Sequence, residues 1–178
     1  MDPRERLKRL LAEKALLRGD FSLSSGKKSQ IYFDCKRVTL DPEGITLIGT
    51  LLLEEIRSIG GVDAVGGPSI GADPVVGHIA GRSHQEGSPL PGFIVRKNPK
   101  QHGTGLKIEN CPPKGARVVI FEDVVTTGGS TLQAVGQAEA AGLKVVGIVS
   151  LLDREEGGAD ALKDYRYRPL FRRSDITA

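Results

Sequence analysis

The sequence predicts an α/β domain in which a mostly parallel sheet is covered by helices on both faces. Two patterns lead to this prediction. Apolar runs at residues 93–95, 117–121 and 145–152 are continuous rather than alternating, which is typical of strands buried on both faces. Segments with helical features alternate with these runs, and such alternation is typical of parallel sheets. A length of 178 residues suits a single domain.

The first part of the chain precedes this alternation. Apolar residues recur at three- and four-residue spacing over 2–18 and predict a helix. Residues 20–40 hold clusters of Ser, Gly and Lys around an Ile-Tyr-Phe run, which indicates short strands or a hairpin. Asp41 is expected to cap a helix that starts with a proline and ends at the pair Gly60-Gly61.

From residue 64 onward, strands and helices are expected to alternate. The predicted strands lie at 64–65, 93–95, 117–121 and 145–152. The predicted helices cover about 72–83 and 129–141. Residues 96–115 contain three prolines and three glycines with little periodicity, so we expect a long loop there.

Composition is that of an ordinary globular protein. Apolar residues make up 39% of the chain and charged residues 26%, which argues against disorder. No apolar run approaches the roughly 20 residues that a membrane span requires, and the charged N-terminus lacks the apolar core of a secretion signal. We therefore expect a cytoplasmic protein with no membrane partner.

Charge, cysteine and histidine content argue against several other classes. A formal net charge of +3 is too small to indicate a nucleic-acid partner. Cys35 and Cys111 lie far apart and form no Cys-x-x-Cys pair, so we expect reduced thiols. The three histidines lack the spacing of zinc ligands, and no structural metal site is expected.

The strongest functional pattern begins with four apolar residues, continues with Glu122 and Asp123, and ends in a small-residue loop that opens a helix. Ligands of open parallel sheets bind beyond the carboxyl ends of the strands. Small residues also let backbone N–H groups approach a phosphate at a helix N-terminus. The alternative is an ordinary strand–turn–helix, in which capping would explain Thr126, Ser130 or Thr131 but not the acid pair. No lysine follows the glycines, so this is not a Walker loop.

A basic segment forms the second pattern. The predicted strand at 93–95 is followed by Arg96-Lys97-Asn98-Pro99-Lys100-Gln101-His102-Gly103. A solvated charged loop is one interpretation. Its position between a buried strand and a stretch rich in glycine and proline favours a mobile lid over an anionic ligand.

The acid pair and its loop resemble the phosphoribosyl-pyrophosphate signature of the type I phosphoribosyltransferases, which is an apolar run, two acids, two more residues and Thr-Thr-Gly. The resemblance implies that Glu122 and Asp123 bind the ribose 2′ and 3′ hydroxyls and that residues 126–130 bind the 5′-phosphate. The set that it assigns to this substrate is Glu122, Asp123, Val124, Val125, Thr126, Thr127, Gly128, Gly129 and Ser130.

The basic segment resembles the catalytic loop of one family in this group, the orotate phosphoribosyltransferases. The resemblance implies that Arg96, Lys97, Lys100 and His102 contact phosphoribosyl pyrophosphate. It also implies that Lys97, Lys100 and His102, together with Asp123, are catalytic.

Two further segments resemble the same family. In its N-terminal segment a lysine contacts the phosphoribosyl substrate and an aromatic pair lines the orotate pocket, and the corresponding positions are Lys28, Tyr32 and Phe33. Core packing is the alternative for the aromatic pair. Arg154 matches an arginine that holds orotate, for which Arg is a natural partner because orotate carries a carboxylate. A surface ion pair is the alternative for this arginine. Thr126 is also expected to contact orotate.

One turn departs from the family pattern. Gly71 stands where some members have a lysine, so this pyrophosphate-binding turn can offer only backbone N–H groups. More of the pyrophosphate charge would then fall to Arg96, Lys97, Lys100 and magnesium. Glu122 stands where many members have aspartate, which is a milder change.

The resemblance covers residues from about 7 to about 172 and implies a type I phosphoribosyltransferase fold. This fold is a mostly parallel five-stranded sheet flanked by helices, in a single domain over 1–178. A small hood over the base would come from about 18–40 and about 165–172. The implied reaction transfers the phosphoribosyl group to orotate in pyrimidine biosynthesis and yields orotidine 5′-phosphate and pyrophosphate.

The resemblance also implies a cofactor and a partner. The cofactor is Mg²⁺, carried by the phosphoribosyl substrate near Glu122 and Asp123, with no protein ligand assigned. The partner is a second copy, in a homodimer with shared active sites. Two rival functions remain, namely a phosphoribosyltransferase for another base and an RNA-binding pyrimidine regulator on the same fold. The basic segment and Arg154 argue against the first, and the small net charge argues against the second.

Overall fold

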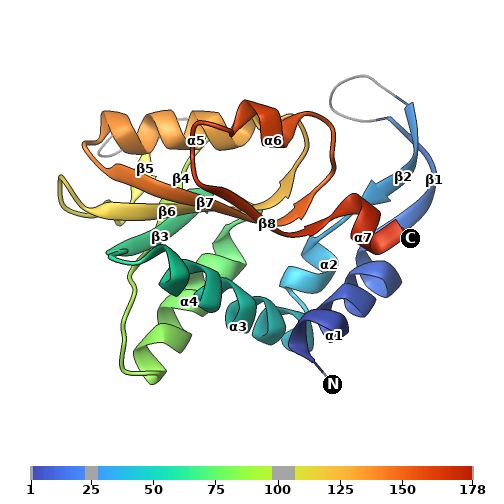
Figure 1. Cartoon of the computed structure of the whole chain (residues 1–178), viewed down its shortest axis with the longest axis horizontal. Coiled ribbons are helices and arrows are strands. Elements are labelled where there is room, and N and C mark those ends of the chain that lie inside the picture. Colours follow the sequence, from blue (N-terminus) through green and yellow to red (C-terminus); the bar gives the residue numbers. More distant parts are fainter. Residues whose placement is uncertain (1, 23–27, 98–106, 178) are drawn as a thin grey trace.

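The computed structural model describes residues 2–22, 28–97 and 107–177. In these residues a central six-stranded sheet has the order β5-β4-β3-β6-β7-β8 (Figure 1). Neighbouring strands are parallel except β4 and β5, which are antiparallel, so the predicted mostly parallel sheet is confirmed. The strands are β3 (Ala64–Pro68), β4 (Gly92–Val95), β5 (Ile108–Glu109), β6 (Arg117–Val125), β7 (Lys144–Asp153) and β8 (Tyr167–Arg172).

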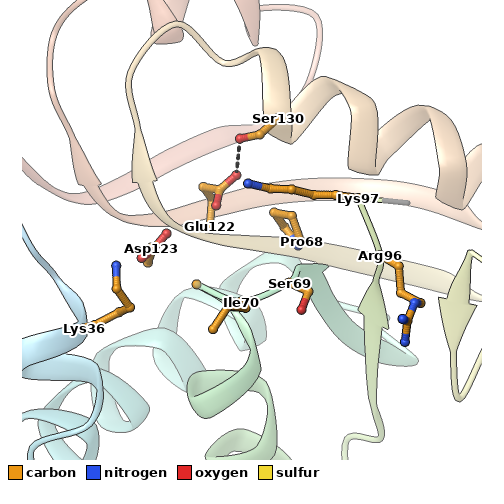
Figure 2. Close-up of a pocket in the computed structure, with 10 residues that line it drawn as sticks. Lys36, Pro68, Ser69, Ile70, Arg96, Lys97, Glu122, Asp123 and Ser130 are labelled. Carbon is orange, nitrogen blue, oxygen red and sulfur yellow. Dashed lines mark hydrogen bonds between the residues drawn. The ribbon is translucent and has the colours of Figure 1, made fainter. Parts of the chain in front are cut away.

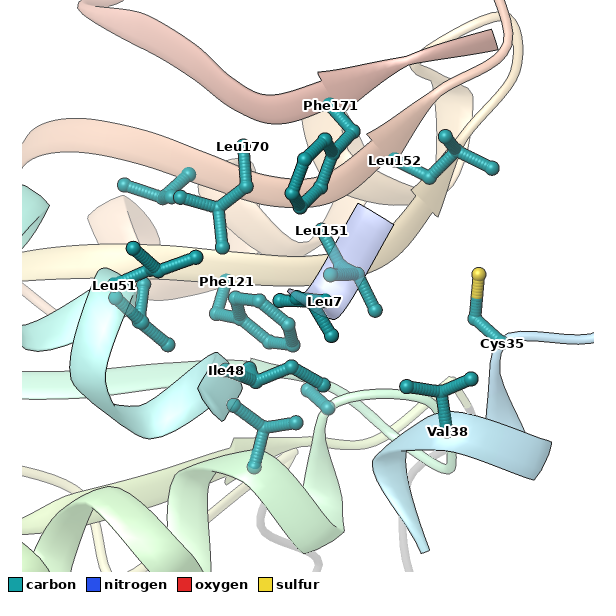
Figure 3. Packing of buried hydrophobic residues seen from close by; sticks show 14 of the residues in the cluster. Leu7, Cys35, Val38, Ile48, Leu51, Phe121, Leu151, Leu152, Leu170 and Phe171 are labelled. Carbon is teal, nitrogen blue, oxygen red and sulfur yellow. The ribbon is translucent and has the colours of Figure 1, made fainter. Parts of the chain in front are cut away.

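Helices cover both faces of this sheet (Figure 1). On one face lie α1 (Pro3–Leu10), α3 (Pro42–Ile59) and α4 (Asp73–Gln85). On the other lie α5 (Gly129–Ala140) and the short α6 (Gly158–Ala161). Figure 3 shows the core beneath the first face, where Phe121 and Leu151 of the sheet gather with Ile48 and Leu51 of α3 and Leu7 of α1.

The predicted start and end of α3 are confirmed. The Asp41 carboxylate accepts hydrogen bonds from the backbone N–H groups of Glu43 and Gly44, at 3.1 and 2.9 Å. Pro42 occupies the first helical position, where its missing N–H has no partner to lose. Gly60 follows the helix with a φ of 77°, which a glycine adopts without steric strain.

The N-terminal segment, called the N-terminal unit below, lies beside the sheet and packs into the same main core (Figure 1). After α1 it consists of η1 (Leu11–Ala15), β1 (Leu16–Ser22), β2 (Lys28–Phe33) and α2 (Lys36–Thr39). The antiparallel pairing of β1 with β2 confirms the hairpin predicted within 20–40. The helix predicted over 2–18 is too long, because Leu16 already pairs with Phe33 in this hairpin.

The C-terminal segment adds a strand to the sheet. Of residues 165–172, which were predicted to contribute to a hood, Tyr167–Arg172 form β8 and pair with β7 in the central sheet. Leu170 and Phe171 account for this position, because both side chains are buried in the main core. The helix that follows, α7 (Arg173–Thr177), packs against α1 and η1 of the N-terminal unit.

Two strands also extend beyond what was predicted. The described sheet has six strands instead of five, because β5 lies inside the predicted loop 96–115 and pairs with Ile94 and Val95. Strand β6 continues past residue 121 to Val125, because β7 pairs with it as far as Asp153. The acid pair therefore lies within a strand.

Two whole-chain expectations can be compared with the structure. Within the described ranges, no helix has the length and apolar character that crossing a bilayer requires. Both cysteines are free, Cys35 being buried and Cys111 exposed, as expected for reduced thiols.

Gly67 allows β3 to approach its neighbours closely. A Cβ atom at this position would lie 2.0 Å from the carbonyl oxygen of Phe121 and 2.8 Å from the Cβ of Ala72. Backbone cannot move aside as a flexible side chain could. Gly77, on the exposed side of α4, has no atom within 4 Å of the corresponding position. The two glycines can therefore be compared directly, since one position is crowded and the other is open.

We predict that alanine has opposite effects at these two positions. Gly67→Ala should lower the free energy of unfolding by about 1–3 kcal/mol, because the added methyl overfills a packed strand. Gly77→Ala should raise it by about 0.5–1 kcal/mol, because alanine favours an exposed helix interior. Urea unfolding followed by circular dichroism measures both. Equal effects of the two substitutions would contradict the packing around Gly67.

Candidate active site

A cavity of about 560 Å³ opens at the carboxyl ends of β3, β4 and β6 (Figure 2). This is the edge at which open parallel sheets bind ligands. The cavity wall carries acidic and basic side chains together. Its lining residues are Lys36, Pro68, Ser69, Ile70, Gly71, Arg96, Lys97, Glu122, Asp123 and Ser130.

Glu122 connects β6 to the start of α5. Its side chain is 5% exposed, and its Oε2 accepts hydrogen bonds from the hydroxyls of Ser130, at 2.9 Å, and Thr131, at 3.0 Å. These hydroxyls thus hold the acid and do not cap the helix, whose N-cap is Gly128 without a side-chain bond. Capping is therefore the wrong interpretation of Ser130 and Thr131.

The loop between β6 and α5 turns at a glycine. Val124 and Val125 end β6, and Thr126 and Thr127 connect it to Gly128. Gly128 has a φ of 83°, which lies in the left-handed region that favours glycine. The predicted phosphate-binding residues therefore follow one another around a single turn at the helix N-terminus, although Ser130 is the one that lines the cavity.

The two adjacent acids are difficult to ionise together. Burial, and then the negative charge of Asp123, raise the pKa of Glu122 to about 7. Burial also raises the pKa of Asp123, although the Val124 N–H and the Lys36 charge favour its ionised form. Cations or hydroxyl donors that enter the cavity would stabilise the ionised forms of the two acids. The predicted substrate would supply both, as ribose hydroxyls and bound Mg²⁺.

The turn after β3 brings Gly71 against Asp123. A Cβ at position 71 would lie 2.3 Å from Asp123 Oδ1, so any side chain there requires the acid to move. The Ser69–Ile70 peptide bond in this turn is cis, and Ser69 Oγ donates to Asp73 Oδ2 at 3.0 Å. At Gly71, where some family members have a lysine, the backbone thus lies directly against the Asp123 carboxylate.

Lys36 is a cavity residue that the sequence did not reveal. It opens α2, and its Nζ lies 3.3 Å from Asp34. Burial lowers the pKa of Lys36, but its hydrogen bond to Asp34 and the charges of Asp34 and Asp123 raise it overall. Figure 2 shows its ammonium group directed toward Asp123. The residue follows the Tyr-Phe run that we assigned to the base, and this position is the one signal that could have indicated it.

The basic segment is partly described. Figure 2 shows Lys97 reaching toward Glu122 across the cavity. Arg96 also lines the cavity, but its guanidinium points away from Glu122 and donates from Nη1 to Glu109 at 3.1 Å. Lys100 and His102 lie outside the described residues.

The predicted residues of β2 do not line this cavity. Phe33 is 4% exposed and belongs to the main core, so core packing is the correct interpretation of its side chain. Tyr32, on the opposite face of the strand, is 36% exposed, and its ring centroid lies 5.5 Å from that of Phe21. Lys28 is exposed at the start of β2.

Arg154 lies in the turn after β7 and also outside the cavity lining. Its side chain is buried, and Nη2 lies 2.8 Å from Glu156 Oε1. The alternative of an ion pair is confirmed, with Glu156 as the partner, but the arginine is buried instead of lying on the surface. Nε of Arg154 is buried with no hydrogen-bond partner in the described part of the chain. This arginine therefore keeps an unused donor.

The described residues contain no group of three or more His, Cys, Asp or Glu side chains arranged to hold a metal ion. Two carboxylates, Glu122 and Asp123, are what the cavity offers to a cation.

We predict that Glu122 makes the ligand-free protein less stable as pH rises. The folded-state pKa of about 7 lies above the ordinary value of 4.5, so the folded protein binds more protons between these values. The free energy of unfolding of the wild type, relative to Glu122→Gln, should therefore fall from pH 4.5 to pH 7 and then level off. Urea unfolding across this range is the measurement. Glu139→Gln, at an exposed position on α5, is the control, and a pH-independent difference at Glu122 would contradict the burial effect.

Comparison with known proteins identifies the family. A family model described as "Phosphoribosyl transferase domain" matches residues 36–170. The orotate phosphoribosyltransferase of Thermosynechococcus vestitus is 44% identical over 180 residues, which cover 99% of this chain and 94% of that protein. The enzyme of the same name from Rhodopirellula baltica is 46% identical over 157 residues, or 85% of this chain and 81% of that one.

A solved structure agrees with these sequence matches. The orotate phosphoribosyltransferase of Mycobacterium tuberculosis H37Rv in complex with 5-phospho-alpha-D-ribosyl 1-diphosphate superposes with a TM-score of 0.82 at 34% identity. The match covers 99% of this chain and 100% of that one. Identity at this level over nearly the whole of both proteins shows that the chain belongs to the orotate phosphoribosyltransferase family.

Proposed function

We propose that this chain transfers the phosphoribosyl group of 5-phosphoribosyl 1-pyrophosphate to orotate, with orotidine 5′-phosphate and pyrophosphate as products. The observation that carries this proposal is the buried acid pair Glu122–Asp123, which shares one cavity with Ser130 of the adjoining loop. The Mycobacterium tuberculosis relative, solved with the phosphoribosyl substrate, supports it. The reaction belongs to pyrimidine biosynthesis and would take place in the cytoplasm.

In the proposed reaction, N1 of orotate bonds to C1 of the ribose and loses its proton, while the bond from C1 to the pyrophosphate oxygen breaks. The departing pyrophosphate can accept that proton. Positive charge develops on the ribose ring in the transition state, and the Asp123 carboxylate would stabilise it. Ribose hydroxyls would donate to Glu122 and Asp123. Ser130, which now donates to Glu122, would then be free to turn to the 5′-phosphate with the rest of the loop.

Mg²⁺ fits this site as an ion that the substrate brings. Mg²⁺ is usually held by one or two carboxylates plus substrate phosphates, and Glu122 and Asp123 provide two carboxylates. We therefore propose that Mg²⁺ enters with the phosphoribosyl substrate and lies near these acids. Its contribution would be to neutralise charge on the departing pyrophosphate.

In this proposal the pyrophosphate site is formed by the cavity residues outside the acid pair. The turn at Gly71 offers backbone N–H groups, and Lys97 already lines the cavity. Arg96 would join Lys97 after leaving Glu109. Lys100 and His102 are assigned to the same ligand by the family resemblance, as catalytic residues that act mainly on the charge of the departing pyrophosphate.

The base would lie between the N-terminal unit and the turn after β7. Tyr32 and Thr126 are proposed to contact the ring, and Arg154 its carboxylate. Phe33 is not proposed to contact orotate, because its side chain is buried in the main core. Lys28 is proposed to reach the phosphoribosyl substrate from the start of β2.

The proposed function is tested by pyrophosphate release from purified protein with Mg²⁺ and the phosphoribosyl substrate. Release should require orotate and should not occur with uracil or adenine. Release with another base would favour the first rival function. No release with any base, together with a gel shift of pyrimidine-operon leader RNA, would favour the regulator.

We predict that Arg154 sets base choice in this assay. Orotate would displace Glu156 from the guanidinium and use its free Nε–H. Arg154→Ala should raise the Michaelis constant for orotate. The lost binding free energy should be about 2–5 kcal/mol, because the substrate carboxylate is left unpaired. The constant for the phosphoribosyl substrate should stay nearly unchanged. Arg154→Lys should rescue partly, because an ammonium group cannot reproduce the fork.

The control for this prediction is Arg168→Ala, which removes an arginine of β8 from its ion pair with Glu55 of α3. It should leave both Michaelis constants near wild type. An unchanged Michaelis constant for orotate in Arg154→Ala would refute the proposal that Arg154 binds the orotate carboxylate.

We further predict complementation between two inactive variants. If Lys100 reaches into the site of a partner subunit, a dimer of Lys100→Ala with Asp123→Asn contains one intact site and one doubly altered site. Random exchange should restore about a quarter of wild-type activity, because half of the dimers are mixed and each has one working site of two. No recovery after subunit exchange, verified by native mass spectrometry, would show that the sites are not shared.

A further inference from the structure

The turn that carries Arg154 is held from inside the sheet by Asp153. This side chain is 2% exposed at the end of β7, and its Oδ1 accepts the backbone N–H of Glu155 at 2.8 Å. Its Oδ2 accepts the Tyr167 hydroxyl at 3.1 Å. The Tyr167 oxygen also lies 2.8 Å from the buried hydroxyl of Ser150. The three side chains form one chain of hydrogen bonds between β7 and β8.

These hydrogen bonds hold the turn in an unusual backbone conformation. Glu155 has a φ of 56°, in the left-handed region that side chains other than glycine rarely adopt. An aspartate that accepts the N–H two residues later stabilises such a turn. The N–H of the intervening Arg154 donates to the Val125 carbonyl at 2.9 Å. The direction in which the arginine leaves the backbone is therefore set by Asp153 and β6 together.

A second anchor holds the same turn from the C-terminal helix. The Glu155 carboxylate accepts the backbone N–H of Ser174, at 2.8 Å, and its hydroxyl, at 3.0 Å. Ser174 belongs to α7, which packs against α1 and η1 of the N-terminal unit. The turn also touches the predicted phosphate loop, because a Cβ on Gly158 would lie 2.9 Å from the carbonyl oxygen of Thr126.

Tyr167 is suited to act as a donor here. Burial, and then the charge of Asp153, raise its pKa, so the phenol stays protonated. Its hydroxyl is the donor to Asp153 Oδ2 in a place where the carboxylate is almost fully removed from water. Loss of this donor would leave a buried acceptor unpaired, which favours a shift of the carboxylate and of the turn that it holds.

We propose that Asp153 and Tyr167 are positioning residues for the base site, which hold the turn so that Arg154 meets the substrate carboxylate. This inference rests on the proposed function of Arg154. Neither residue would touch the substrate. Both act on the placement of the guanidinium, and correct placement of a binding group is worth much more than its presence alone.

The first test uses two tyrosines that differ in their contacts. Tyr167→Phe removes the hydroxyl that bonds Asp153, whereas Tyr165→Phe makes the same chemical change two residues earlier, at a half-buried ring. Tyr167→Phe should raise the Michaelis constant for orotate about tenfold or more, because misplacement of a binding group weakens its contact steeply. The turnover number at saturating orotate and the constant for the phosphoribosyl substrate should change little. Tyr165→Phe should leave all three near wild type.

The second test uses the acceptor. Asp153→Asn keeps an oxygen that can accept the Glu155 N–H, whereas Asp153→Ala removes it. The Asn variant should therefore rescue most of the orotate affinity that the Ala variant loses. Thermal unfolding followed by circular dichroism shows whether each variant is folded, and Tyr167→Phe remains informative if Asp153→Ala is not.

The outcomes separate this inference from the function on which it rests. A wild-type protein without orotate-dependent pyrophosphate release would overturn the proposed function itself. An active wild type with an unchanged orotate constant in folded Tyr167→Phe and Asp153→Ala would overturn the positioning role alone. A parallel rise of both Michaelis constants would also overturn it, because that pattern indicates general loosening of the fold.

Discussion

The parallel pairing of β6 with β7, which continues to Val125 and Asp153, is the constraint on which the whole site depends. It extends β6 beyond its apolar run, so Glu122 and Asp123 become strand residues whose directions are fixed by the sheet. It also brings the N–H of Arg154 to the carbonyl of Val125. One ladder of backbone hydrogen bonds thus sets the distance between the residues proposed for the ribose and the residue proposed for the base.

Within that frame, a buried acid shapes the loop that follows. Glu122 is removed from water and needs donors, and Ser130 and Thr131 supply them from the first turn of α5. The loop is therefore held close to the cavity before any ligand arrives. A ligand with hydroxyl groups can take over these bonds at low cost, since it exchanges one set of donors for another.

Local sequence signals predicted the ends of α3 and the position of the acid pair. Asp41 and Gly60 mark the ends of α3 by their own side-chain and backbone chemistry, and the acid pair stands out because charge directly follows a buried run. Features that depend on distant partners could not be predicted. Strand β5 has two residues and exists through its pairing with β4, and β8 joins the sheet through β7.

The same distinction applies to individual side chains of the site. The alternation of β2 decides that Phe33 enters the core while Tyr32 faces outward, and the strand register needed for this was not evident in advance. Lys36 reaches the cavity from the start of α2, and its position shortly after the Tyr-Phe run was the one local signal for it.

The contact between Gly71 and Asp123 has a steric consequence. Because the space of a β-carbon at position 71 is filled by the carboxylate, a lysine cannot be introduced there by a single substitution without disturbing a residue proposed for ribose binding. A side chain at position 71 and the present direction of the Asp123 carboxylate therefore exclude each other. Placing a lysine at this turn would require the carboxylate to turn aside, so the pyrophosphate turn and the proposed ribose site are coupled sterically.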